Sequence, residues 1–209
     1  MFYEPKDGHG LAKNPFNSLV VPRPIGWISS IDGEGNVNLA PYSFFNGVAY
    51  NPPTVMFSSG HGQVEDDGMK DSLRNIMETG EFVHNFTTWD NREAMNDTSA
   101  TTAKNRDELA DAGLTPIPST LVKAPRVKES PIHFECKLIG TYDLPNTIGN
   151  NIYTVIFGEV IGVHIADDLI MENGRIDIAK LHPVARMGYQ DYTEVTGETV
   201  FTMDRPGFR

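Results

Sequence analysis

The chain has 209 residues, with 17 Lys and Arg against 28 Asp and Glu, so its formal net charge is −11. This length favours one domain over residues 1–209, since single domains commonly hold about 100–200 residues. The acidity argues against non-specific binding to nucleic acid or to an anionic membrane surface, because both need a basic face. Any anionic ligand must therefore be held by a local group of donors.

Strands dominate the predicted elements. In chain order we expect them at residues 25–31, 37–39, 54–58, 81–86, 133–138 and 153–166. The first two flank Asp-Gly-Glu-Gly, which predicts a hairpin. In the last one, Val155, Phe157, Ile161, Val163 and Ile165 alternate with smaller or polar residues. This period of two indicates that one side of the strand faces the core, while the other is covered or lies near a ligand.

The predicted helices are few and short. Asp71 is a good N-cap for a segment in which Leu73 and Ile76 fall at helical spacing, and Gly80 supplies the stop. Two further helices are expected at residues 91–96 and 106–112. Strands with occasional helices, without a regular βαβ alternation, predict a mainly β barrel or sandwich.

The common catalytic and nucleotide-binding motifs are missing. Gly-x-Gly occurs at residues 33–35 and 60–62, but neither has the third glycine of a dinucleotide loop. The six histidines are widely spread, so no metal site is predicted. Cys136, the only cysteine, lies in an apolar strand, where a buried inert thiol is favoured over a nucleophile. It also excludes an intrachain disulfide.

The first 16 residues lack the apolar stretch of a signal peptide, and no apolar run reaches the about 20 residues of a transmembrane helix. We therefore expect a cytoplasmic protein.

Two blocks combine a rigid backbone, aromatic rings and short polar groups. Residues 21–30 place Arg23 between two prolines, and residues 38–46 interleave hydroxyls and amides with aromatic rings. This mixture suits a flat heteroaromatic ligand. Core packing of Phe44 and Phe45 accounts for the same pattern.

The two blocks resemble the flavin-reductase-like family, the FMN-binding split barrels related to pyridoxamine-phosphate oxidase. The resemblance continues in order along nearly the whole chain, through Asn51-Pro52-Pro53, Gly68-Met69-Lys70-Asp71-Ser72, Glu81-Phe82-Val83, Gly113-Leu114-Thr115-Pro116 and His182-Pro183-Val184-Ala185-Arg186-Met187-Gly188. It implies an antiparallel Greek-key split barrel with a few short peripheral helices. It also implies a homodimer with FMN near the subunit interface.

The resemblance places the FMN phosphate at the start of the helix that follows Lys70, and we assign Lys70 and Ser72 to it. The Asp71 carboxylate would repel a phosphate, so we expect it to cap the helix. Further candidates for the phosphate or the ribityl hydroxyls are Ser43, Asn46, Ser58 and Ser59. A solvated surface lysine is the alternative for Lys70. Three acidic residues within 59–68 would weaken phosphate binding unless they point to solvent.

The flavin ring needs a planar slot with a polar margin. We assign this to Trp27, Ser29, Ala40, Pro41 and Phe44, with Asn38 in the same cofactor-binding set. Core packing is an equal alternative for Trp27. Arg23 and Arg186 are the candidate cations for the flavin ring or the phosphate, with surface salt bridges as the alternative.

Hydride transfer to a flavin needs no acid, base or nucleophile from the protein, so no catalytic residue is predicted. The leading hypothesis is an FMN-dependent NAD(P)H:flavin oxidoreductase that serves a partner monooxygenase. The alternative is an FMN-binding, flavoredoxin-like electron carrier that receives electrons from a reduced protein donor. A second alternative is a member of the family that has lost flavin.

Overall fold

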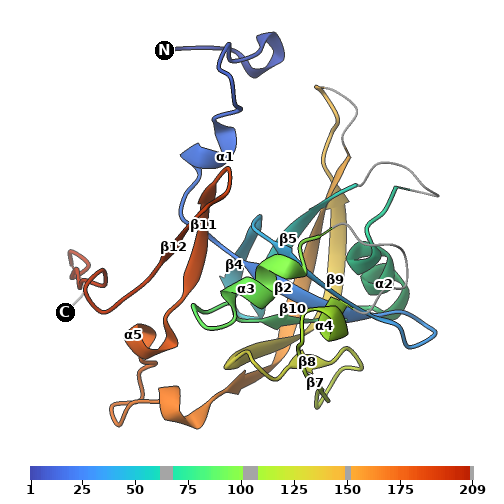
Figure 1. Cartoon of the computed structure of the whole chain (residues 1–209), viewed down its shortest axis with the longest axis vertical. Coiled ribbons are helices and arrows are strands. Elements are labelled where there is room, and N and C mark those ends of the chain that lie inside the picture. Colours follow the sequence, from blue (N-terminus) through green and yellow to red (C-terminus); the bar gives the residue numbers. More distant parts are fainter. Residues whose placement is uncertain (62–67, 101–107, 149–151, 208–209) are drawn as a thin grey trace.

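A computed structural model describes residues 1–61, 68–100, 108–148 and 152–207 (Figure 1). The acidic residues 65–67 of the loop before the predicted phosphate site lie outside these ranges. The strands are β1 (Arg23–Pro24), β2 (Gly26–Ile31), β3 (Val37–Tyr42), β4 (Phe45–Tyr50), β5 (Pro53–Gly60), β6 (Glu81–Asn85), β7 (Pro116–Ile117), β8 (Arg126–Val127), β9 (Ile132–Asp143), β10 (Tyr153–Ile165), β11 (Val184–Gly188) and β12 (Asp191–Glu194). The helices are α1 (Phe16–Leu19), α2 (Asp71–Thr79), α3 (Arg92–Asp97), α4 (Glu108–Asp111) and α5 (Ile178–Leu181), with single 3-10 turns at Pro5–Asp7 and Asp167–Leu169.

The main sheet has seven antiparallel strands in the order β3-β2-β6-β9-β10-β5-β4. Its two outermost strands, β3 and β4, are consecutive in the chain, and only Ser43 and Phe44 join them. So short a link between opposite edges requires the sheet to curl back on itself into a barrel. Since β3 and β4 do not pair, the barrel is split along this line. The predicted antiparallel split barrel with short outer helices is confirmed.

All six predicted strands are confirmed, and each expected helix overlaps an observed one. The capping role of Asp71 was wrong. Lys70 is the N-cap residue of α2, without a side-chain cap, and Asp71 is the first helical residue. Its carboxylate instead accepts a hydrogen bond from Arg74 Nη1 at 2.6 Å. Gly80 ends α2 in the left-handed conformation, with φ of 71°, as expected of a helix stop.

The barrel interior holds one apolar cluster, and α2 closes one side of it. Leu73 and Ile76 of α2 are buried with Ile28, Phe57 and Phe82. Each such side chain contributes about 1.5–3 kcal/mol on burial, so this contact fixes where α2 begins. The Cys136 thiol lies in the same cluster, and burial raises its pKa. This confirms that the cysteine is buried.

Over the first half of β10, the row with the larger apolar residues lies on the outer side of the barrel. Thr154, Ile156 and Gly158 face inward, whereas Val155 and Phe157 lie half-buried on the outer side. The interior leaves no room for a side chain at position 158. A Cβ atom at Gly158 would lie 2.4 Å from the ring of Phe82. The apolar outer side of β10 therefore has a different use from core packing.

A second unit stands beside the barrel. β1, β11 and β12 form a three-stranded sheet, with α1 next to β11 (Figure 1). In Figure 1 this arm and both chain termini lie on the side of the barrel away from α2. Among the described residues, no helix is long and apolar enough to cross a membrane.

Candidate functional site

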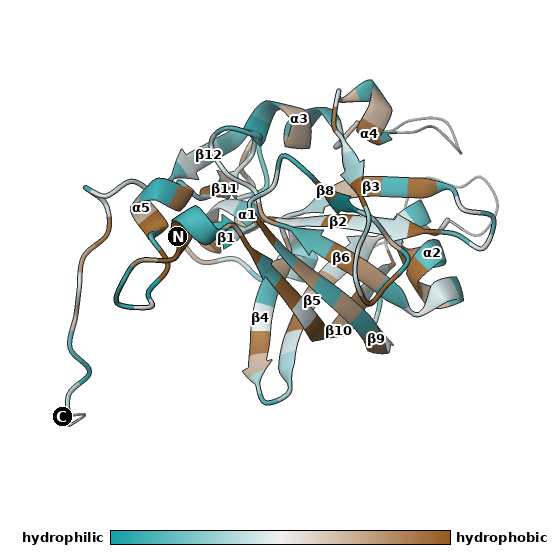
Figure 2. Ribbon diagram, turned by 90° about the horizontal axis from the view of Figure 1, so that it is seen from below, coloured by the Kyte–Doolittle hydropathy of each residue, from teal (hydrophilic) through white to brown (hydrophobic). Residues whose placement is uncertain are grey.

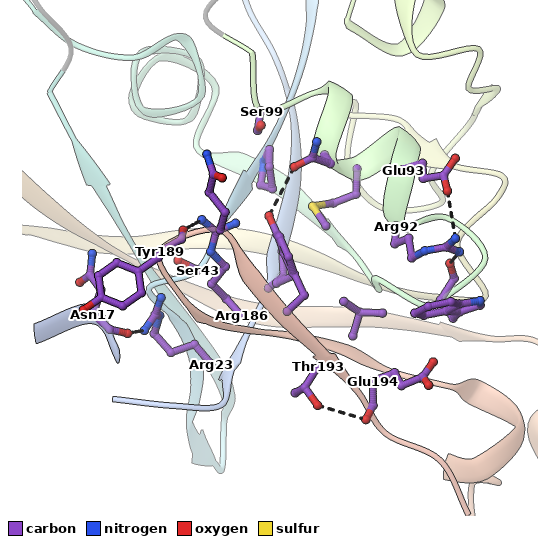
Figure 3. Close-up of a pocket in the computed structure, with 18 of the residues that line it drawn as sticks. Asn17, Arg23, Ser43, Arg92, Glu93, Ser99, Arg186, Tyr189, Thr193 and Glu194 are labelled. Atoms are coloured by element: carbon purple, nitrogen blue, oxygen red, sulfur yellow. Dashed lines mark hydrogen bonds and ion pairs between the residues drawn. The ribbon is translucent and has the colours of Figure 1, made fainter. Parts of the chain in front are cut away.

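A cavity of about 1580 Å³ lies between this arm and the barrel. Its walls come from α1, β1, the β3–β4 link, α3 and the β11–β12 hairpin. Four of the predicted cofactor residues line it: Arg23, Pro41, Ser43 and Arg186. Figure 3 shows Arg23, Arg186 and Ser43 on one wall, next to Asn17 and Tyr189. Residues far apart in the sequence therefore meet at this cavity.

The two predicted arginines are direct neighbours. Arg23 and Arg186 are opposite each other in the β1–β11 ladder. Arg23 Nη1 donates to the backbone carbonyls of Asn17 and Val20 at the end of α1, and Arg186 Nη2 donates to Tyr189 O. Burial lowers the pKa of Arg23, and the positive charge of Arg186 lowers it further. The sequence left open which arginine faces which part of the cofactor; in the structure both belong to the same end.

The opposite end of the cavity is aromatic, and two of its carboxylates have close partners. The Arg92 guanidinium lies 3.8 Å from the centroid of the Trp89 ring and donates to Glu93 Oε1 at 2.9 Å. Glu194 is 2.9 Å from His182 Nε2. His182 itself does not line the cavity, and it ends α5 with φ of 52°.

The other predicted polar residues gather where β5 ends and α2 begins. The hydroxyls of Ser58 and Ser59 are buried and lack a hydrogen-bond partner. The Tyr42 phenol lies near Ser59 and Ser72, and burial raises its pKa. Lys70 Nζ lies 5.8 Å from the centroid of the Tyr42 ring. This group of hydroxyls and an ammonium is a ready set of donors.

Asn38 and Asp71 support this group. Asn38 Nδ2 donates to the Ser72 hydroxyl at 2.6 Å, which fixes the Ser72 side chain. The Asp71 carboxylate is occupied by Arg74 in an ion pair of 2.6 Å. Pairing with a guanidinium reduces the repulsion that Asp71 would exert on an anion at the start of α2.

The β3–β4 link, Ser43 and Phe44, lies between the cavity and the polar residues at the end of β5. Ser43 lines the cavity, and the carbonyl of Phe44 accepts a hydrogen bond of 2.9 Å from Ser58 N. Asn46 lies on β4 opposite Met56, exposed, with its amide oxygen bonded to Gly47 N. An elongated ligand along this edge would meet ring-sized space at one end and hydroxyl and ammonium donors at the other.

Two predicted residues do not belong to the site. Trp27 is fully buried, and its indole N–H donates to Thr98 Oγ1 at 2.9 Å. Ser29 is fully buried as well and donates to Pro125 O at 2.5 Å. Both side chains are therefore occupied inside the protein, and we remove them from the slot for the flavin ring. Ala40 packs partly against the barrel core, so only its backbone is left for a ligand.

The donor set fits FMN. Unpartnered buried hydroxyls, an ammonium and the free N–H groups of a nine-residue helix suit a phosphate monoester. Pro41, Ser43 and Phe44 offer the mixed apolar and polar border that a planar ring needs.

The sequence model of the "Flavin reductase like domain" family matches residues 18–180. The chain belongs to this family. Family membership supports flavin binding and flavin-linked oxidoreduction as the class of activity.

Several known proteins are similar to this member of the family over most of their length. A protein from Aquifex aeolicus is 39% identical over 183 residues, which cover 86% of this chain and 88% of that protein. The crystal structure of nitrilotriacetate monooxygenase component B from Bacillus cereus has 33% identity and a TM-score of 0.85, covering 97% and 98% of the two chains. The structure of 2-nitrobenzoate 2-nitroreductase from Pseudomonas fluorescens has 29% identity and a TM-score of 0.79, covering 93% and 90%.

Sequence reasoning missed much of the cavity wall. Lys13, Asn17, Trp89, Arg92 and Tyr189 line it and were not predicted. The available signal was Trp89 followed three residues later by Arg92, since a guanidinium at this spacing can stack on the indole ring. No sequence signal marked the residues of the β11–β12 hairpin, because they reach the cavity only through the pairing of β1 with β11.

Proposed function

We propose that this protein is an FMN-dependent NAD(P)H:flavin oxidoreductase. The observation that carries the proposal is the continuous edge from the cavity, through Ser43 and Phe44, to the unpartnered hydroxyls of Ser58 and Ser59. Similarity along nearly the whole chain to a monooxygenase component B adds support. The proposal includes a partner monooxygenase that consumes the reduced flavin.

We assign the phosphate to Lys70 and Ser72 at the start of α2, with Ser59 beside them, and we assign Ser58, on the other face of β5, to the ribityl hydroxyls. Pro41, Ser43 and Phe44 would border the flavin ring, and Asn46 would meet the ribityl chain. Bound FMN supplies the chemistry, since its N5 accepts a hydride from a reduced nicotinamide. The chain's own residues bind, orient and exclude water, and none needs to act as acid or base.

The proposal also includes a homodimer. The outer sides of β9, β10 and β5 place Tyr142, Val155 and Ser58 next to one another across the ladders. Phe157 and Met56 form the neighbouring row. In Figure 2 no helix lies beneath β4, β5, β9 and β10, whose ribbons carry brown apolar segments. A second copy on this face would cover the apolar residues and lie beside Ser58 of the cofactor site.

An absorbance experiment tests the reaction. Purified protein saturated with FMN is mixed anaerobically with NADH and, separately, with NADPH. Rapid loss of the oxidised flavin band with either nucleotide is the expected result, and the faster nucleotide is the donor. A band that persists with both would contradict the reductase and leave a carrier fed by a reduced protein. Failure to bind FMN at all would remove both functions.

A further inference from the structure

Arg23 and Arg186 form a pair of like charges without an acidic partner among the described residues. Their Cα atoms are in register on neighbouring antiparallel strands, where like charges directly opposite one another destabilise the pairing. In the part of the chain that the structure describes, no carboxylate forms an ion pair with either guanidinium. Arg23 is only 6% exposed, and its Nε–H is buried without a partner.

Two uncompensated guanidinium groups, one of them buried, are costly in a protein. The cost is notable here because the chain carries 28 acidic residues that could have neutralised them. Instead, Glu93 and Glu194 pair at the far end of the same cavity with Arg92 and His182. Asp97 of α3 is the remaining described acidic residue on the cavity wall. Positive charge is thus concentrated at one end.

Lys13 adds a third cation to this end. It lines the cavity, with its ammonium 5.5 Å from the centroid of the Tyr189 ring. Tyr189 in turn supplies the carbonyl that holds Arg186. Hydrogen bonds to backbone carbonyls orient both arginines, so their positions do not depend on a ligand.

We propose that Arg23 and Arg186, with Lys13, bind the pyrophosphate of the dinucleotide that donates the hydride, at the opposite end of the site from the FMN phosphate. This inference rests on the proposed function and adds the residues that would hold the second substrate. It differs from the sequence-based prediction, which assigned both arginines to the cofactor.

The chemistry favours a pyrophosphate over a single carboxylate. A pyrophosphate presents two negative charges and several acceptor oxygens, which match two forked guanidinium groups side by side. One carboxylate would leave a positive charge uncompensated. The cavity of about 1580 Å³ has room for a dinucleotide beside the flavin ring.

Calorimetric titration of inorganic pyrophosphate into FMN-saturated protein tests the site without turnover. We expect saturable binding to the wild type and a Kd at least tenfold higher in Arg186→Gln. The charge-matched control is Arg175→Gln, an exposed arginine away from the cavity, and its Kd should equal that of the wild type. Circular dichroism spectra and melting curves establish that each variant is folded. Pyrophosphate should also compete with NADH or NADPH for binding.

Three results would overturn the inference. The first is no pyrophosphate binding to the wild type. The second is tighter binding of benzoate than of pyrophosphate, which would indicate a carboxylate site. The third is an FMN Kd raised tenfold or more in Arg186→Gln, which would return the arginine to the cofactor. If NADH or NADPH bleaches the flavin while Arg186→Gln binds pyrophosphate normally, only this inference fails. If neither nucleotide bleaches the wild-type flavin, the proposed reductase fails.

Discussion

Glu135 shows how one buried residue of β9 organises a long loop. Its carboxylate accepts hydrogen bonds from the backbone N–H groups of Thr120, Leu121 and Val122 at 2.8, 2.6 and 3.1 Å. His164 Nε2 lies 2.5 Å from the same carboxylate. These hydrogen bonds satisfy backbone N–H groups of residues 120–122, which belong to no strand or helix. A fully buried carboxylate is therefore tolerated because each of its oxygens has donors.

We expect Glu135→Gln to destabilise the protein by about 1.5–3 kcal/mol, the usual range for hydrogen bonds to a charged group. Burial alone would raise the pKa of Glu135, but the N–H groups of Thr120 and Leu121, together with His164, hold it below its ordinary value. The measurement is urea unfolding at neutral pH. The exposed Glu172→Gln is the matched control and should leave the free energy of unfolding unchanged.

The same pKa gives a pH dependence. Because the pKa is lower in the folded state than in the unfolded state, the ionised Glu135 stabilises the fold above the unfolded value of about 4.3. This stabilisation is lost as the pH falls below that value. Unfolding curves between pH 6 and 3 should thus show a shallower loss of stability for Glu135→Gln than for the wild type. Equal slopes would contradict the role of the carboxylate.

At the scale of elements, the decisive junction is the end of β5 against the start of α2. β5 brings Ser58 and Ser59 with consecutive side chains on opposite faces of the sheet. α2 adds Lys70 and Ser72, and its position follows from the burial of Leu73 and Ile76 in the barrel. The proposed phosphate site is thus a consequence of how α2 packs.

The double variant Lys70→Ala/Ser72→Ala should raise the Kd for FMN at least tenfold, equivalent to about 1.4 kcal/mol or more. It removes a charged donor and a hydroxyl donor from the phosphate. Quenching of FMN fluorescence on titration with protein measures the change. Lys70→Ala alone separates the loss of charge from the loss of the Asn38–Ser72 hydrogen bond.

Lys128→Ala provides the charge control, because Lys128 is exposed and lies outside both groups of the site. An FMN Kd that is the same in the double variant and in Lys128→Ala would remove Lys70 and Ser72 from the phosphate site.

At the scale of the whole molecule, the outer face of β9, β10 and β5 exposes large apolar side chains. Tyr142 is 57% exposed, and Val155 and Phe157 are half-buried beside it. Large exposed apolar patches mark interaction surfaces. We therefore locate the proposed contact between two copies on this face, with Ser58 at its border.

Tyr142→Lys combined with Val155→Lys should convert the proposed dimer into a monomer, because two ammonium groups would be buried against apolar surface. Light scattering after size-exclusion chromatography gives the mass. The same variant should bind FMN more weakly if the second copy completes the site. Met77→Lys, which alters an exposed apolar residue on α2, should leave the mass unchanged. A wild-type protein that is monomeric at all tested concentrations would contradict the proposal.

Some elements of the fold could be predicted from local sequence patterns. The strands near 26–31, 81–85 and 132–143 followed from apolar runs and turn residues, since both depend on local chemistry. Gly80 as the end of α2 followed from its freedom to adopt a positive φ. Lys70 and Ser72 were selected by resemblance, and the structure brings them near Ser59 and Tyr42.

Other predictions depended on which way a side chain points. The alternation along β10 is real, but only the structure shows that Val155 and Phe157 lie on the outer side, while Gly158 packs against Phe82 on the inner side. Trp27 is a core residue because its side of β2 is covered by Met95 of α3 and Leu109 of α4. Period-two patterns identify two faces, and they leave open which one the barrel encloses.

By itself the sequence determined the strand-rich composition, the family resemblance and the short polar residues that can hold FMN, because these depend on residue type and local order. Only the tertiary structure decided that Arg23 and Arg186 are neighbours, that Ser43 joins the cavity to Ser58, and that Trp27 and Ser29 are enclosed. Pairing between β1 and β11 joins residues 163 positions apart. The β3–β4 link lies beside β5 only because the sheet curls into a barrel. Such long-range contacts arise from the packing of the whole chain, and no local pattern of residues records them.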